Sequence, residues 1–146
     1  MGYFGRILVG QGIEPVPGVT VLDERELGGG WRWWQCDGDL PGGLDALVGR
    51  SGAPALWAYI VDSDLADVEA LTPSGLRFRT YLHPEMAESY DAPPLAQSPE
   101  EVLDLARRWA AEAGLTPDDV ALRSVLEAEN TFAEATLGEL VVALGI

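Results

Sequence analysis

Three carboxylates near the middle of the chain have the types and spacing that could hold a divalent cation. Asp62 follows an apolar run over residues 56–61. On a continuing strand, the side chain of Asp64 would share its side at a separation of about 7 Å. With Asp67 they would offer Mg²⁺ or Ca²⁺ the oxygen ligands that these ions prefer. The calcium-loop pattern is broken, because Ala66 stands where a third ligand belongs. The same side chains suit a hairpin turn, in which they bond nearby backbone amides, and we favour this interpretation.

Other catalytic motifs are incomplete. His83 is the only histidine, so acid–base chemistry near neutral pH would rest on one imidazole or on carboxylates. It directly precedes Pro84, where a strand gives way to a helix, and we expect a structural role at that junction. Gly10 and Gly12 follow a strand as in a dinucleotide-binding loop, but Pro15 takes the place of the third glycine. We therefore expect no cofactor.

The segment over residues 31–34 is the candidate binding site. On a strand, Trp31 and Trp33 point to one face of the sheet, while Arg32 and Trp34 point to the other. Tryptophan and arginine are enriched at the energetic centres of protein interfaces, where they fill pockets of a partner. The alternative, which we favour, is that Trp34 lies under the glycine- and proline-rich loops of its own chain.

The arginines at 77 and 79 and the single cysteine are expected to have structural roles. Arg77 and Arg79 share one face of a strand, and we expect them to pair with carboxylates such as Glu69. Cys36 is the only cysteine, so an intrachain disulfide is impossible. No lysine or histidine adjoins it to lower its pKa, and we expect a small buried residue.

The first 82 residues have the pattern of strands. Residues 56–61 are apolar on both alternating sides, which predicts a strand in the middle of a sheet that is covered on both faces. Runs rich in β-branched and aromatic residues alternate with turns rich in glycine and proline. The expected strands cover residues 3–9, 19–22, 31–36, 56–61, 68–72 and 76–82.

The later residues carry helix signals. Ser98 precedes a proline and has a glutamate three positions on, which predicts an N-cap with a capping box. Thr116 is expected to begin a second helix in the same way. A third helix is expected to start near Thr131, with Glu134 completing its box and Phe132 on its apolar face. Shorter helices are expected over residues 44–48 and 84–90.

Strands followed by helices predict an α+β fold. We expect a largely antiparallel sheet formed by residues 3–82, with C-terminal helices between residues 98 and 144 packed on one face. The whole chain, residues 1–146, is expected to form a single domain, strand-rich over 1–82 and helix-rich over 84–146.

The charge balance limits the possible partners. The chain has 24 acidic residues against nine arginines and no lysine, a net charge of −15, yet 47% of its residues are hydrophobic. This composition predicts a folded domain with an acidic surface. Because such a surface repels phosphate groups, we expect no nucleic acid and no membrane as partner. The sequence has no apolar segment long enough for a signal peptide or a membrane span, so we expect a cytoplasmic protein. The composition, which has arginine but no lysine, is typical of high-GC bacterial genomes.

These observations favour a non-enzymatic protein-binding module. The acidic surface would speed association with a basic protein and exclude acidic ones. We expect such a module to act in the way of an immunity protein or antitoxin, a small acidic protein that neutralises a toxin or another basic partner. The alternative is a divalent-metal-dependent enzyme that uses Asp62, Asp64 and Asp67.

Overall fold

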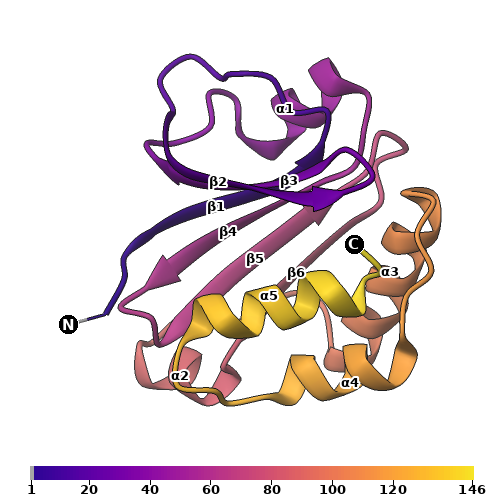
Figure 1. Cartoon of the computed structure of the whole chain (residues 1–146). Helices are drawn as coiled ribbons and strands as arrows, with labels where there is room; N and C mark the ends of the chain where they lie inside the picture. The colour runs from indigo at the N-terminus through magenta and orange to yellow at the C-terminus, as the bar shows by residue number, and fades with distance from the viewer. Residues whose placement is uncertain (1) are drawn as a thin grey trace.

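The computed structural model describes residues 2–146, which form one antiparallel sheet with helices on both faces (Figure 1). The predicted α+β class is confirmed. Within the described residues, the strands are β1 (Gly5–Gln11), β2 (Thr20–Gly28), β3 (Trp31–Asp37), β4 (Ala55–Val61), β5 (Leu65–Leu71) and β6 (Arg77–Leu82). The helices there are α1 (Gly43–Ser51), α2 (Pro84–Ser89), α3 (Pro99–Glu112), α4 (Asp119–Glu127) and α5 (Ala133–Ala143).

The sheet has the strand order β2-β3-β1-β4-β5-β6, and every neighbouring pair is antiparallel. Strand β1 lies at the centre, where Ile7, Leu8 and Val9 are at most 2% exposed because both faces are covered. Strand β4 is internal, as predicted for residues 56–61. Its Tyr59 is nevertheless 38% exposed, so the cover on that face stops short of this residue.

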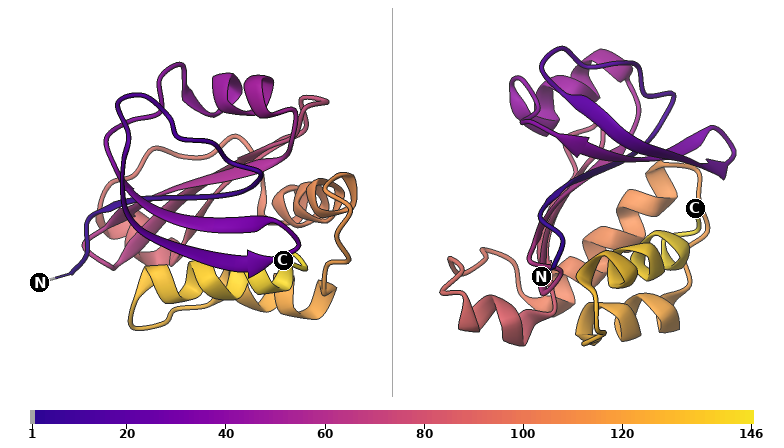
Figure 2. Two further views of the ribbon diagram at one scale, coloured as in Figure 1. Left: turned by 45° about the horizontal axis from the view of Figure 1, so that its top comes forward. Right: turned by 60° about the vertical axis from the view of Figure 1, so that its left-hand side comes forward.

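Helices α3, α4 and α5 cover one face of the sheet (Figure 2). The core on this face includes Trp109 of α3, which is fully buried. The ring centroid of Trp109 lies 5.9 Å from that of Trp31 in β3. Its indole N–H donates a hydrogen bond of 3.1 Å to the carbonyl oxygen of Leu71 in β5. One side chain therefore joins α3 to strands in both halves of the sheet.

The opposite face is covered by α1 and by the loops that follow β1 and β3 (Figure 1). Leu8, Trp34 and Leu44 pack together in this second core. The sequence predicted the C-terminal helices on one face and loops rich in glycine and proline over Trp34 on the other, but it did not place α1 in this second layer. The second layer explains why β1 is apolar on both sides.

The helix starts follow local capping only in part. The capping box of α3 is confirmed, because Ser98 and Glu101 each accept a hydrogen bond of 3.2 Å from the backbone amide of the other. Helix α4 begins two residues later than predicted, since Asp118 rather than Thr116 is its N-cap and accepts from the amide of Ala121.

None of the helices among residues 2–146 has the length and apolar character of a membrane span.

The two edges of the sheet differ. The side chain of Gln97 forms two hydrogen bonds with the backbone of β6. Its Oε1 accepts from the backbone amide of Arg79 at 3.0 Å, and its Nε2 donates to the backbone carbonyl of Arg77 at 3.2 Å. Strand β2 is mostly exposed and has irregular pairing near its two ends. Bulges of this kind and a covered edge both discourage pairing with other chains.

The buried thiol of Cys36 is expected to be unreactive in the folded protein. Cys36 is 1% exposed, and burial raises the pKa of its thiol to about 11. Since the thiolate is the reactive form, we expect a thiol reagent near neutral pH to react about 100-fold more slowly with the native protein than with the urea-unfolded protein. The release of thionitrobenzoate from Ellman's reagent measures both rates. Equal rates would contradict the buried position.

Candidate functional site

The turn between β4 and β5 is a centre of hydrogen bonding. Asp62 and Ser63 both have positive φ, 51° and 56°, and the Asp64 amide donates to the Val61 carbonyl at 2.9 Å. They form a tight left-handed turn within the three-residue loop between the paired Val61 and Leu65. The predicted hairpin turn is therefore present at this position. Because left-handed backbone is costly for residues other than glycine, contacts from elsewhere in the chain must stabilise this turn.

Ser63 provides those contacts. Its amide donates to the Tyr3 carbonyl at 2.9 Å, and its hydroxyl oxygen accepts from the Tyr3 amide at 2.7 Å. The hydroxyl also donates to a carboxylate oxygen of Glu134 at 2.8 Å, while the carbonyl accepts from the Ala133 amide at 2.6 Å. One buried serine thus fixes the N-terminal segment, the turn and the start of α5.

This arrangement replaces the capping box predicted at Thr131. The N-cap of α5 is Phe132, which has no side-chain oxygen to bond the free amides of the first turn. The carbonyl of Ser63 accepts the Ala133 amide instead, and Glu134 bonds Ser63 rather than the backbone of its own cap. The cap is supplied by a distant segment, which local sequence does not reveal.

His83 supports the same turn from the other side. It is 2% exposed, and its ring nitrogens lie 2.8 Å from the Asp64 carbonyl oxygen and 2.7 Å from the Thr136 hydroxyl. The Asn130 amide donates to Nε2 at 3.3 Å, which assigns the ring proton to Nδ1. These surroundings suit a structural residue and leave His83 out of reach of a substrate.

Three exposed aromatic side chains surround the turn. Phe4 is 59% exposed, Tyr90 42% and Phe132 53%. Phe4 follows Tyr3, and Phe132 is the N-cap of α5 beside Ser63, so the hydrogen bonds of Ser63 hold both close to the turn. The prediction that Phe132 lies on the apolar face of the last helix is wrong.

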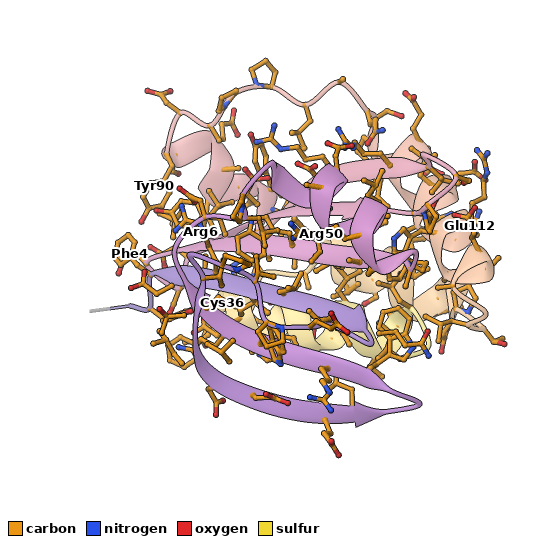
Figure 3. All side chains as sticks on the ribbon, turned by 90° about the horizontal axis from the view of Figure 1, so that it is seen from above. Phe4, Arg6, Cys36, Arg50, Tyr90 and Glu112 are labelled. Carbon is orange, nitrogen blue, oxygen red and sulfur yellow. The ribbon has the colours of Figure 1, made fainter. Side chains whose placement is uncertain are left out.

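The third aromatic residue is bonded to the turn directly. The Tyr90 hydroxyl donates to a carboxylate oxygen of Asp64 at 2.9 Å, and this hydrogen bond raises the pKa of Tyr90. Figure 3 shows Phe4 and Tyr90 at the same end of the molecule. Single exposed apolar side chains are common on folded proteins, but a group of them at one place marks a surface that binds a partner.

The same end of the molecule carries carboxylates that have no ion pair with arginine within residues 2–146. The Glu85 amide donates to the carboxylate of Glu129, which brings α2 and the segment before α5 together. We call this surface, with its three aromatic residues, the acidic end. Its carboxylates are Asp62, Asp64, Glu85, Glu88, Asp91 and Glu129. Glu134 lies beneath them, with one carboxylate oxygen bonded to Ser63 and the other buried.

The three aspartates predicted as metal ligands do not form one donor set. Asp62 accepts from the Gly2 amide at 2.8 Å, and Asp64 accepts from Tyr90. Asp67 pairs with Arg79 through two hydrogen bonds of 2.9 and 2.7 Å. Among residues 2–146, no group of three histidine, cysteine, aspartate or glutamate side chains is arranged to hold a metal ion.

The predicted binding segment is mostly core. Trp31, Trp33 and Trp34 are 4%, 5% and 3% exposed, with Trp31 and Trp33 under the C-terminal helices and Trp34 under the loops of the opposite face. Arg32 is bonded to Glu24 at 2.8 Å. The alternation of faces within the segment is as expected, and only Arg32 is accessible to a partner.

Arg77 and Arg79 pair with carboxylates, as predicted. Arg77 bonds Asp45 and lies 3.8 Å from Glu69, while Arg79 bonds Asp67. Exposed ion pairs of this kind contribute little to the stability of the fold.

Sequence reasoning missed the acidic end because its parts come from four distant segments. The one local signal is Phe132, an aromatic residue at a position where a helix normally begins with a capping side chain. Comparison of the chain with models of known families, with curated proteins and with solved structures finds no match.

Proposed function

We propose that this protein is a non-enzymatic binding module that captures a basic protein through the acidic end. The observation that carries the proposal is the group of three exposed aromatic side chains, Phe4, Tyr90 and Phe132, held around a turn with unpaired carboxylates. Aromatic residues supply most of the binding energy at protein interfaces, and surrounding polar groups exclude water from them.

The charge of the acidic end favours a partner rich in lysine and arginine. The whole chain carries −15, which steers a basic protein towards it and repels acidic proteins. Elsewhere, eight of the nine arginines are already paired with carboxylates within residues 2–146. At the acidic end, Asp62, Asp64 and Glu129 accept hydrogen bonds from uncharged groups only, so their negative charge is not neutralised by arginine within residues 2–146. An immunity protein or antitoxin that neutralises a basic toxin would need this combination.

The hydrogen bonds beneath the surface support tight binding. Ser63 and His83 are buried and fix the backbone on which the aromatic residues stand. A surface that is ordered before binding loses less conformational entropy when a partner docks. The acidic end is therefore suited to recognition without rearrangement.

Phe132 provides a test that separates binding from folding. A serine at an N-cap accepts a hydrogen bond from the first turn of the helix and stabilises it by about 1 kcal/mol relative to a residue that cannot cap. We expect Phe132→Ser to keep or raise the melting temperature while it weakens partner binding at least about tenfold, because it removes an interface anchor. Thermal unfolding and quantitative capture of the partner on immobilised protein measure the two effects.

A charge test accompanies this variant. Immobilised wild-type protein is exposed to a lysate of the host cell at low salt, washed with increasing salt, and the released proteins are identified by mass spectrometry. The variant Glu88→Gln with Asp91→Asn removes two charges from the acidic end. The matched control, Glu14→Gln with Glu26→Gln, removes two exposed charges at the other end of the central strands.

The proposal requires a specific pattern. A basic protein should be retained by the wild type and by the control, and should be lost from Phe132→Ser and from the Glu88 and Asp91 variant. If both acidic-end variants retain the same proteins as the wild type, the acidic end is not the binding surface.

A further inference from the structure

A second site lies at the opposite end of β1, away from the acidic end. It is a pocket of about 410 Å³ between the last turn of α1, the loop that follows β1 and the start of β4. Its floor is apolar, formed by Ile13, Val16, Leu47 and Ala55, all of them buried. A volume of this size is within the range of pockets that hold small molecules.

The walls of the pocket are stiff. Three prolines line it, Pro15, Pro17 and Pro54, and each fixes one backbone angle of its segment. The floor residues belong to the second core, together with Trp34 and Leu44. A pocket with rigid walls is already formed before the ligand binds, so binding costs less conformational entropy.

One cation lines the pocket, and it is unusual in this chain. Arg50, in the last turn of α1, is the one arginine without an ion pair within residues 2–146, although acidic residues outnumber arginines by 24 to nine. Figure 3 shows Arg50 on the side of the sheet that carries α1. Its guanidinium offers a planar fork of N–H donors that matches a carboxylate.

We propose that this pocket binds a small monocarboxylic acid with a compact apolar body. The apolar floor and the prolines would contact the body, and Arg50 would pair with the carboxylate. A single charge is favoured over a phosphate dianion for two reasons. Only one cation lines the pocket, together with the carboxylate of Glu14, and the net charge of −15 repels a second negative charge.

The other polar side chains that line the pocket are those of Gln11, Glu14 and Ser51, and none of them forms an ion pair with Arg50 within residues 2–146. The amide of Gln11 donates to the Gly29 carbonyl at 2.7 Å, and the hydroxyl of Ser51 bonds the backbone at Ala53. Both side chains are therefore occupied within the protein. Specificity for the acid group rests on Arg50.

Phenylacetate and its neutral isostere phenylacetamide test the inference. Each is titrated into ¹⁵N-labelled protein, and amide chemical shifts are recorded. We expect phenylacetate to give saturable shifts at residues 10–13 and 47–52, with a dissociation constant on the order of 1 mM for so small a probe. We expect phenylacetamide to bind at least about tenfold more weakly, because it lacks the charge-assisted hydrogen bonds.

Two arginine variants locate the site. Arg50→Gln should weaken phenylacetate binding at least about tenfold, whereas Arg108→Gln, which removes the same charge from the exposed face of α3, should leave it unchanged. Arg50 is exposed, so this variant should retain the amide spectrum of the wild type outside the pocket. The inference is overturned if phenylacetate gives no saturable shifts, if the amide binds equally, or if Arg50→Gln binds as the wild type does.

Discussion

Replacement of Trp109 with alanine is expected to lower the free energy of unfolding by about 4 kcal/mol. The side chain is fully buried, so its removal leaves a large cavity between α3 and the sheet. It also removes the aromatic contact with Trp31 and the hydrogen bond to the Leu71 carbonyl. Urea unfolding followed by far-ultraviolet circular dichroism measures the loss without depending on tryptophan fluorescence.

Trp109→Phe separates the contributions of the cavity and the hydrogen bond. Phenylalanine keeps most of the apolar contact but leaves the Leu71 carbonyl without its side-chain donor. We expect this variant to lose about 2 kcal/mol, between the wild type and the alanine variant. A Trp109→Ala protein as stable as the wild type would show that α3 does not rest on this side chain.

Replacement of His83 with alanine is expected to destabilise the protein by about 4 kcal/mol, because it removes buried hydrogen bonds and leaves a cavity. The Asp64 carbonyl, the Thr136 hydroxyl and the Asn130 amide would each lose their bond to the ring. Alanine keeps the φ of 62° that histidine already adopts, so the backbone strain is similar in the two proteins. The midpoint of urea unfolding is the measurement.

His83→Gly is the matched control for the strain. Glycine lacks the same hydrogen bonds but adopts positive φ without steric cost. We expect it to be more stable than His83→Ala by about 1 kcal/mol, in spite of its greater flexibility when unfolded. Equal stability of the two variants would show that the positive φ at this position carries no strain.

The sequence predicted the elements that depend on neighbouring residues. Alternation of apolar residues located the strands, and the Ser98 capping box located the start of α3. Each of these patterns involves residues that lie within a few positions of one another, so it can be recognised without knowledge of the tertiary structure.

The candidate site depends on contacts between distant segments, which is why the sequence did not reveal it. Thr131 and Glu134 have the types of a capping box, but Ser63 lies 71 positions from Glu134 and takes its carboxylate. Trp34 has the type of an interface residue, yet the loop over Ile13 and Val16 covers it. For Trp34 the sequence offered these loops as one of two interpretations, whereas nothing near Glu134 in the sequence pointed to Ser63.

The central position of β1 has a consequence for the order in which the molecule folds. Strands β2 and β3 are consecutive and so are β4, β5 and β6, so each group can pair from residues close in the chain. Neither group touches the other without β1, whose Gly5 faces Ile60 and whose Arg6 faces Cys36. Because the pairing of β1 with β3 and with β4 joins segments far apart in the chain, we expect this step to limit the rate of folding.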